Sequence, residues 1–103
     1  MPTVHKVLTA EKHPNADRLR VYNMVETANV YMKENDQGVT EFFRPTRQIV
    51  ANLTNIYEVG DDVNIIIPGE EFEGTVMAET EIRGVKSEGM AIGKTHNHLV
   101  SER

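Results

Sequence analysis

Short runs of apolar and β-branched residues recur along the chain, separated by glycine, proline and asparagine. Residues 4–10 alternate with a period of two, and residues 63–67 (VNIII) read as a buried strand that stops at Pro68 and Gly69. Further strands are expected within residues 19–32, 40–53, 75–84 and 89–94. Because strands bury every second residue and helices do not, this pattern predicts five or six short strands.

The polar segments between these runs have the composition of turns. Residues 12–17 (KHPNAD) combine proline with two side chains that can accept backbone donors, and residues 33–39 (KENDQGV) fit a hairpin tip. Pro45 lacks a backbone donor, so the strand before it is expected at an edge or as an irregular lead-in. Residues 54–62 (TNIYEVGDD) are too short for an ordinary helix, and one helical turn or a loop is expected there.

This order of elements predicts an all-β domain spanning residues 1–103, with residues 94–103 as a flexible tail. A small closed or partly closed barrel removes the exposed edges that so few strands would otherwise leave. Its interior is expected to contain Leu8, Leu19, Val21, Val25, Ile49, Val63, Ile65 and Ile92.

Composition limits the classes of function. The 103 residues include no cysteine, and the formal net charge is −5. Thiolate metal sites and cysteine nucleophiles are therefore excluded, and any nucleic-acid site must be local because a uniformly basic surface is lacking. The chain starts with no continuous apolar signal segment and contains no run near the about 20 apolar residues of a membrane span, so a soluble, cytoplasmic protein is expected.

Residues 83–90 (RGVKSEGM) form the stretch with the most distinctive chemistry. Its two glycines fit a loop that leads into a strand. Arg83 and Lys86 can neutralise phosphate, Ser87 can donate a hydrogen bond to a phosphate or ribose oxygen, and Met90 offers a polarizable surface to a base. The alternatives are a solvated loop whose cations are partly cancelled by neighbouring glutamates, and a core position for Met90.

Four segments together resemble the tRNA-binding OB-fold domain of phenylalanyl-tRNA synthetase β subunits, of some methionyl-tRNA synthetases and of the endothelial monocyte-activating polypeptide II group. They are residues 13–21 (HPNADRLRV), 47–55 (RQIVANLTN), 67–74 (IPGEEFEG) and 81–90 (EIRGVKSEGM). The resemblance implies a five-stranded OB-fold barrel with a short helical turn. It also implies a polar binding surface that includes Asn52 and Asn55 beside the 83–90 loop, and Arg47 is a candidate to extend this surface toward the hairpin near residues 30–44.

The function implied by this resemblance is non-catalytic binding of tRNA or another structured RNA, recognised by shape and backbone, in trans or within an aminoacyl-tRNA synthetase assembly. The alternative is a CsaA-like protein-interaction or chaperone domain on the same fold, which the negative charge does not disfavour. The partner is then RNA, a synthetase or another protein, with no membrane contact, and the chain is expected to be a monomer or a homodimer.

Neither a cofactor nor a catalytic site is expected. The sequence contains no nucleophile-elbow pattern and no phosphate loop of Walker type. His96 and His98 would share a face of a strand, but no cysteine or nearby carboxylate completes a set of three or four ligands, so a metal site is not predicted there.

Overall fold

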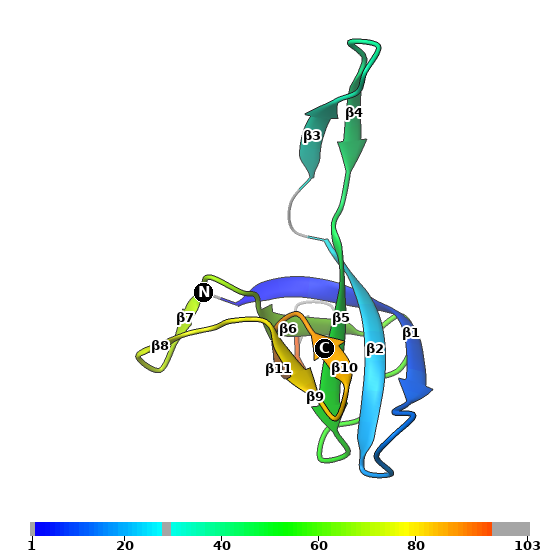
Figure 1. Cartoon of the computed structure of the whole chain (residues 1–103), viewed down its shortest axis with the longest axis vertical. Helices are drawn as coiled ribbons and strands as arrows, with labels where there is room; N and C mark the ends of the chain where they lie inside the picture. The colour runs from blue at the N-terminus through cyan, green and yellow to red at the C-terminus, as the bar shows by residue number, and fades with distance from the viewer. Residues whose placement is uncertain (1, 28–29, 96–103) are drawn as a thin grey trace, which may run out of the picture.

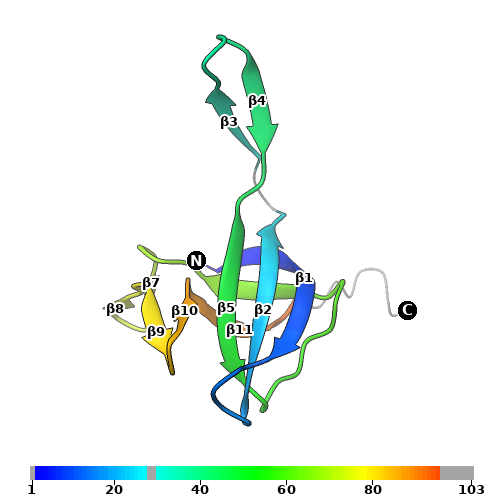
Figure 2. The same cartoon turned by 45° about the vertical axis from the view of Figure 1, so that its right-hand side comes forward.

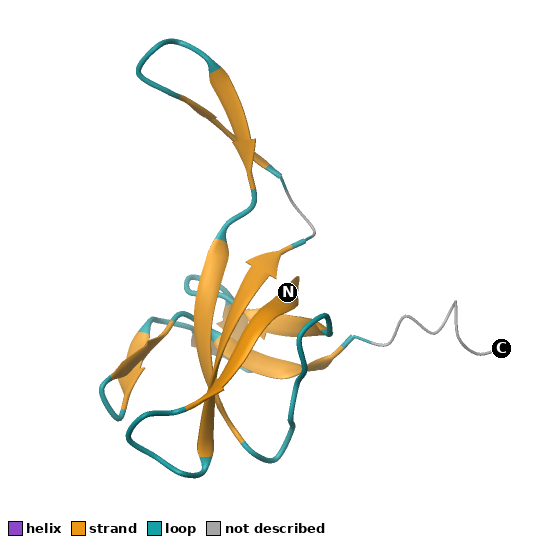
Figure 3. Cartoon of the chain, turned by 90° about the vertical axis from the view of Figure 1, so that its right-hand side faces the viewer, coloured by secondary structure: helices purple, strands orange, loops and turns teal. Residues whose placement is uncertain are grey.

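The computed structural model describes residues 2–27 and 30–95. This part of the chain consists of strands and connecting loops, and it forms four antiparallel sheets (Figures 1 and 3). The strands are β1 (Thr3–Lys12), β2 (Leu19–Glu26), β3 (Tyr31–Glu34), β4 (Thr40–Phe43), β5 (Thr46–Asn52), β6 (Asp62–Ile66), β7 (Glu71–Phe72), β8 (Thr75–Val76), β9 (Thr80–Ile82), β10 (Val85–Ser87) and β11 (Met90–Lys94). The all-β class predicted from the sequence is confirmed.

The main sheet has five strands in the order β11-β6-β1-β2-β5 and curls into a half-barrel (Figure 2). The long strand β1 pairs with β6 through its first half and with β2 along most of its length. A register shift between Val7 and Thr9 interrupts the β1–β2 pairing. Such bulges bend a strand and increase its twist, so this one helps β1 to curl. The arrangement agrees with an OB-like barrel.

The expected helical turn does not form in the described residues. Residues 53–61 between β5 and β6 are turns and irregular backbone. The amide of Tyr57 donates to the Tyr22 hydroxyl at 3.2 Å, and the amide of Glu58 donates to a carboxylate oxygen of Asp61 at 2.9 Å. Side chains thus satisfy backbone donors of this loop without a helical turn.

The core lies on the concave face of the curled sheet. It is the buried cluster of Val7, Tyr22, Met24, Ile49, Tyr57, Val63 and Ile65. The expected core positions Ile49, Val63 and Ile65 are confirmed, whereas Leu19, Val25 and Ile92 are only half-buried. Val21 is buried outside this cluster, because side chains alternate along β2 and Tyr22 and Met24 point into the core.

Leu8 was expected inside, and this prediction is wrong. Its side chain is 44% exposed. Leu8 lies at the register shift, which leaves it without a partner between Val7 and Thr9. The extra residue shifts the inward–outward alternation of side chains along β1. The inward positions Val7 and Ala10 are therefore three residues apart instead of two.

A second sheet, the β3–β4 hairpin, projects from one end of the half-barrel (Figures 1 and 2). The hairpin tip predicted for residues 33–39 is residues 35–39, because Lys33 and Glu34 still belong to β3; the amide of Asn35 donates to the Val39 carbonyl oxygen at 2.9 Å. All eight strand residues of the hairpin are exposed, including Met32 at 68% and Phe42 at 69%. The segment 40–53, expected as one strand, divides into β4 and β5 at Arg44 and Pro45.

The C-terminal edge of the described part belongs to the sheet. Lys94 is the last residue of β11, and the amide of Thr95 donates to the Asp62 carbonyl oxygen at 2.8 Å. Residues 94 and 95 of the expected tail thus join the half-barrel, while His96, His98 and the remaining residues lie outside the described ranges. No helix within the described ranges is long and apolar enough to cross a membrane.

Candidate nucleic-acid interface

The loop predicted to contact RNA begins with a tight turn between β9 and β10. Ile82 pairs with Val85, so the turn contains only Arg83 and Gly84, with φ angles of +55° and +87°. Two consecutive residues with positive φ are the signature of a type I′ hairpin turn. Arg83 is therefore displayed at the tip of a short, well-defined hairpin, at a backbone conformation that non-glycine residues seldom adopt.

The turn is held by the loop between β1 and β2. His13 is buried, and its Nδ1 accepts the amide of Asn15 at 2.9 Å. Its Nε2 must then carry the proton, which it donates to the Ile82 carbonyl oxygen at 2.9 Å. The Asn15 side-chain amide donates to the Arg83 carbonyl oxygen at 3.0 Å. Hydrogen bonds therefore join two segments that resembled the tRNA-binding family, residues 13–21 and 81–90.

Ser87 anchors the second half of the loop to β5. Its side chain is buried, and its hydroxyl accepts the amide of Val50 at 3.1 Å and donates to the Gly89 carbonyl oxygen at 3.0 Å. Gln48 and Glu88 reinforce the attachment, since the amide of Gln48 donates to the Glu88 carboxylate at 2.9 Å and the amide of Glu88 donates to the Gln48 carbonyl oxygen at 2.7 Å. The hydroxyl proton of Ser87 is thus used within the protein.

A groove opens beside this anchored loop, with a volume of about 400 Å³. It brings together three predicted site residues, Asn52, Asn55 and Met90, although they lie up to 38 positions apart in the sequence. The other lining residues are Leu19, Val50, Ala51, Thr54, Tyr57, Ile82 and Ala91. Every lining side chain is uncharged, so the groove suits a neutral, partly apolar group such as a nucleobase better than a phosphate.

Tyr57 forms part of the groove lining and links it to the core. Its ring packs edge-on against Tyr22 with the ring centroids 5.4 Å apart. Burial, and secondarily the neighbouring Tyr22, raise the pKa of Tyr57 above its usual value. Its hydroxyl therefore remains protonated around neutral pH and is able to donate a hydrogen bond.

The cations Arg83 and Lys86 lie outside the groove lining. Arg83 directly follows Ile82, which lines the groove. Lys86 lies beside a second, shallower cleft of about 360 Å³ that Lys12 also lines. The Lys86 ammonium group is 3.5 Å from a Glu79 carboxylate oxygen, and its side chain is 56% exposed. A contact this exposed costs little to exchange for a phosphate, so both cations remain available to a ligand.

Arg47 lies at the opposite end of β5 from Asn52. It is five residues from Asn52 along β5, a separation of about 17 Å for an extended strand. Its side chain is only 18% exposed, and its guanidinium donates to the buried Glu26 carboxylate at 2.8 Å and to Nε2 of His5 at 2.9 Å. The structure therefore places Arg47 in a polar cluster at the hairpin end of the half-barrel.

Comparison with known proteins shows the family to which this chain belongs. The family model of the putative tRNA binding domain matches residues 3–102. The chain belongs to this family.

Relatives of this family member include phenylalanine–tRNA ligase beta subunits. The protein from Leptospira biflexa serovar Patoc is 33% identical over 85 residues, which cover 82% of this chain and 8% of the relative. The protein from Nitrosospira multiformis is 34% identical over 94 residues, covering 86% of this chain and 10% of the relative. The chain thus spans about a tenth of the length of these relatives.

Sequence reasoning missed the anchoring residues of this tRNA-binding domain family member. The hydrogen bonds of His13 and Gln48 were not predicted, and Glu88 was considered only as a charge that partly cancels the neighbouring cations. Their hydrogen bonds join residues up to 69 positions apart. The motifs HPN (residues 13–15) and RG (residues 83–84) contain the two partners of the Asn15–Arg83 hydrogen bond, but a single sequence does not show that these segments meet.

Proposed function

We propose that this chain is a non-catalytic module that binds tRNA or another structured RNA in trans or within an aminoacyl-tRNA synthetase assembly. The observation that carries the proposal is the groove, which gathers Asn52, Asn55 and Met90 next to the β9–β10 turn in a chain of the tRNA-binding family. In this proposal an unpaired base enters the groove, and Arg83 and Lys86 neutralise phosphates beside it.

Ser87 and Arg47 have different roles in this proposal from the direct contacts expected at first. Ser87 fixes the loop that presents Lys86 and Met90, because its hydroxyl bonds both β5 and Gly89. Arg47 stabilises the other end of the half-barrel through Glu26. Both residues support the binding surface without touching RNA.

Replacing Arg83 and Lys86 together with alanine tests the proposal. Binding of total tRNA should weaken by about 1–3 kcal/mol, or about 5- to 150-fold in Kd, because two phosphate contacts are lost. The slope of log Kd against log salt should flatten from a shallow parent value of about 2–4, since few phosphates are neutralised. Filter binding at several salt concentrations measures both quantities. The melting temperature should stay nearly unchanged, because both side chains are exposed.

The matched control is the double variant Lys33→Ala and Arg44→Ala in the hairpin. It removes the same two positive charges from exposed positions away from the groove. Its affinity for tRNA should remain close to that of the parent. Equal weakening in both double variants would mean that only the overall charge matters, and no weakening in the Arg83/Lys86 variant would refute the proposed contact surface.

A protein partner is the second candidate, as in a CsaA-like interaction domain. The observation in its favour is the hairpin, whose Met32 and Phe42 form a directly opposed pair and are each more than two-thirds exposed. Large exposed apolar side chains often mark protein contacts. RNA binding that is absent even at low salt would favour this alternative over the first.

A further inference from the structure

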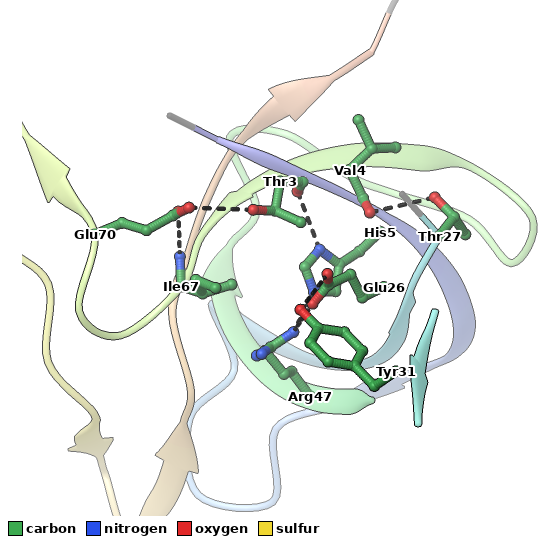
Figure 4. Close-up of polar contacts among 9 residues, drawn as sticks. All are labelled: Thr3, Val4, His5, Glu26, Thr27, Tyr31, Arg47, Ile67 and Glu70. Atoms are coloured by element: carbon green, nitrogen blue, oxygen red, sulfur yellow. Dashed lines mark hydrogen bonds and ion pairs between the residues drawn. The ribbon is translucent and has the colours of Figure 1, made fainter. Parts of the chain in front are cut away.

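A buried polar cluster joins four strands where the hairpin meets the half-barrel (Figure 4). His5 from β1, Glu26 from β2 and Arg47 from β5 lie in contact, and Tyr31 reaches them from β3. The side chains of His5 and Glu26 are fully buried. Buried charges are rare unless they are paired, so this cluster is a specific feature of the fold.

The hydrogen bonds define the protonation state of His5. Arginine carries only donors, so Nε2 of His5 must accept the hydrogen bond from Arg47 at 2.9 Å. The ring proton then lies on Nδ1, which donates to the Thr3 carbonyl oxygen at 3.0 Å. His5 is therefore neutral in this arrangement. A second proton on Nε2 would place two donors and two positive charges against each other.

The cluster extends from His5 to the hairpin through charged groups. The Arg47 guanidinium donates to one carboxylate oxygen of Glu26 at 2.8 Å, and the Tyr31 hydroxyl donates to the other at 2.9 Å. Tyr31 is the first residue of β3. The amide of Glu26 also donates to the carbonyl oxygen of Pro45, at the return of the hairpin, at 2.9 Å. Glu26 thus holds both ends of the hairpin.

The surroundings of His5 oppose its protonation. Burial is the main cause that lowers the pKa of His5 from its ordinary value of 6.5, and the charge of Arg47 adds to it. The hydrogen bond to Thr3 and the carboxylates of Glu26 and Glu70 act in the opposite direction and only partly offset these effects. Glu70 faces the cluster from the loop after β6, where its carboxylate accepts the Thr3 hydroxyl at 3.2 Å.

We propose that His5 is a proton-sensitive latch for the β3–β4 hairpin. Neutral His5 accepts from Arg47 and keeps the guanidinium against Glu26, which in turn binds Tyr31. When Nε2 takes up a proton from water, Arg47 loses its acceptor and moves outward along its partly exposed side, and the Glu26 carboxylate turns toward the new N–H donor on Nε2 and away from Tyr31. The hairpin then changes its orientation relative to the half-barrel while the half-barrel stays folded.

The direction of the pH effect follows from proton linkage. Burial and the Arg47 charge lower the pKa of the latched His5, and release removes the Arg47 charge, so the released His5 has a higher pKa than the latched one. The latch is therefore at full strength above about pH 6.5 and weakens as pH falls through the window between the two pKa values. Below the lower value no further weakening from this group is expected.

The absence of cysteine from the sequence permits a direct test. Cysteines introduced as Asp17→Cys in the β1–β2 loop and Gln37→Cys at the hairpin tip can carry a fluorophore pair. Both positions are exposed, and the hydrogen bond of residue 37 uses its backbone amide. Energy transfer measured between pH 8 and pH 4.5 should show one narrow distance distribution at pH 8. It should shift or broaden with a midpoint below pH 6.5, with unchanged far-ultraviolet circular dichroism.

Two variants assign the effect to the cluster. His5→Gln stays neutral at every pH, so the acid-induced shift should disappear. Tyr31→Phe removes the hydroxyl that binds Glu26, so the distribution should already be broad at pH 8. His13→Gln is the matched control, because it changes the other buried histidine at the opposite end of β1 and should retain the acid-induced shift.

Several results would overturn the latch. The parent distribution could stay constant down to pH 4.5, or the half-barrel could unfold together with the hairpin. The shift could also persist in His5→Gln, or Tyr31→Phe could match the parent at pH 8. If His5→Gln does not fold, the parent titration and Tyr31→Phe still decide, since both start from a protein with the native histidine.

Discussion

Replacing Gly89 with valine should lower the free energy of unfolding by about 2–6 kcal/mol. Gly89 has a φ of +138°, and a Cβ atom there would lie 2.6 Å from the Ile66 carbonyl oxygen and 3.1 Å from Cγ2 of Ile65. The backbone strain and the overpacking each cost about 1–3 kcal/mol, and β11 and β6 cannot separate without breaking their pairing. Small domains have only about 5–15 kcal/mol in total, so this variant is close to unfolding. Urea titration followed by tyrosine fluorescence measures the loss.

Gly84→Val is the matched control for this variant. Gly84 also has a positive φ, +87°, but the nearest atom to an added Cβ is the side-chain nitrogen of Asn15 at 3.5 Å, which is ordinary contact. Only the backbone strain remains, so the expected loss is about 1–3 kcal/mol. Equal losses at the two positions would show that the close approach of Gly89 to β6 has no energetic weight.

Several strand and turn positions along the chain could be predicted because local chemistry determines them. Alternation over residues 63–67 and the stop at Pro68 and Gly69 correspond to β6, and the polar segment 33–39 corresponds to the hairpin tip. Pro68 and Gly69 end β6, and Gly38 lies in the hairpin tip, so these boundaries depend on a few neighbouring residues. The gathering of Asn52, Asn55 and Met90 was also predicted, although from the family resemblance rather than from the residues alone.

Which side chains of a strand point into the core was harder to predict. In β2 the apolar set Leu19, Val21 and Val25 competes with Tyr22 and Met24 on the other face, and the structure buries the second set in the core. Val21, on the other face of β2 from Tyr22 and Met24, is also buried, and it lines a cleft together with Val85 and Lys86 of β10. This burial on both faces removes the usual contrast along the strand. The bulge at Leu8 depends on pairing with β2, which no local pattern of β1 specifies.

Whether a polar side chain faces solvent or a buried partner was also difficult to predict. Ser87 and Arg47 carry side chains suited to phosphate, and from the sequence alone they look like surface contacts. In the structure their hydrogen-bonding groups are used by Val50, Gly89, Glu26 and His5. Whether a donor faces solvent or a buried acceptor depends on residues that lie 2 to 42 positions away, and a single sequence does not pair them.

Replacing Arg47 should have a second large effect on stability. It tests whether Arg47 contacts RNA or stabilises the fold through Glu26. Arg47→Ala leaves the Glu26 carboxylate, whose side chain is 1% exposed, without its cation. Removing one partner of a buried ion pair costs about 3–5 kcal/mol, so the free energy of unfolding should fall by that amount in urea titration. The same variant should bind tRNA with nearly the parent affinity at a temperature where it is folded.

The double variant Glu26→Gln and Arg47→Met supplies the control, because it removes both charges and fills part of the space. Replacing a buried ion pair by neutral groups is often close to neutral in stability, so the double variant should recover at least half of the loss of Arg47→Ala. If Arg47→Ala instead keeps its stability and loses tRNA affinity, the guanidinium reaches RNA as the sequence first predicted. In that case the ion pair with Glu26 contributes little, and the binding surface extends along β5 toward the hairpin.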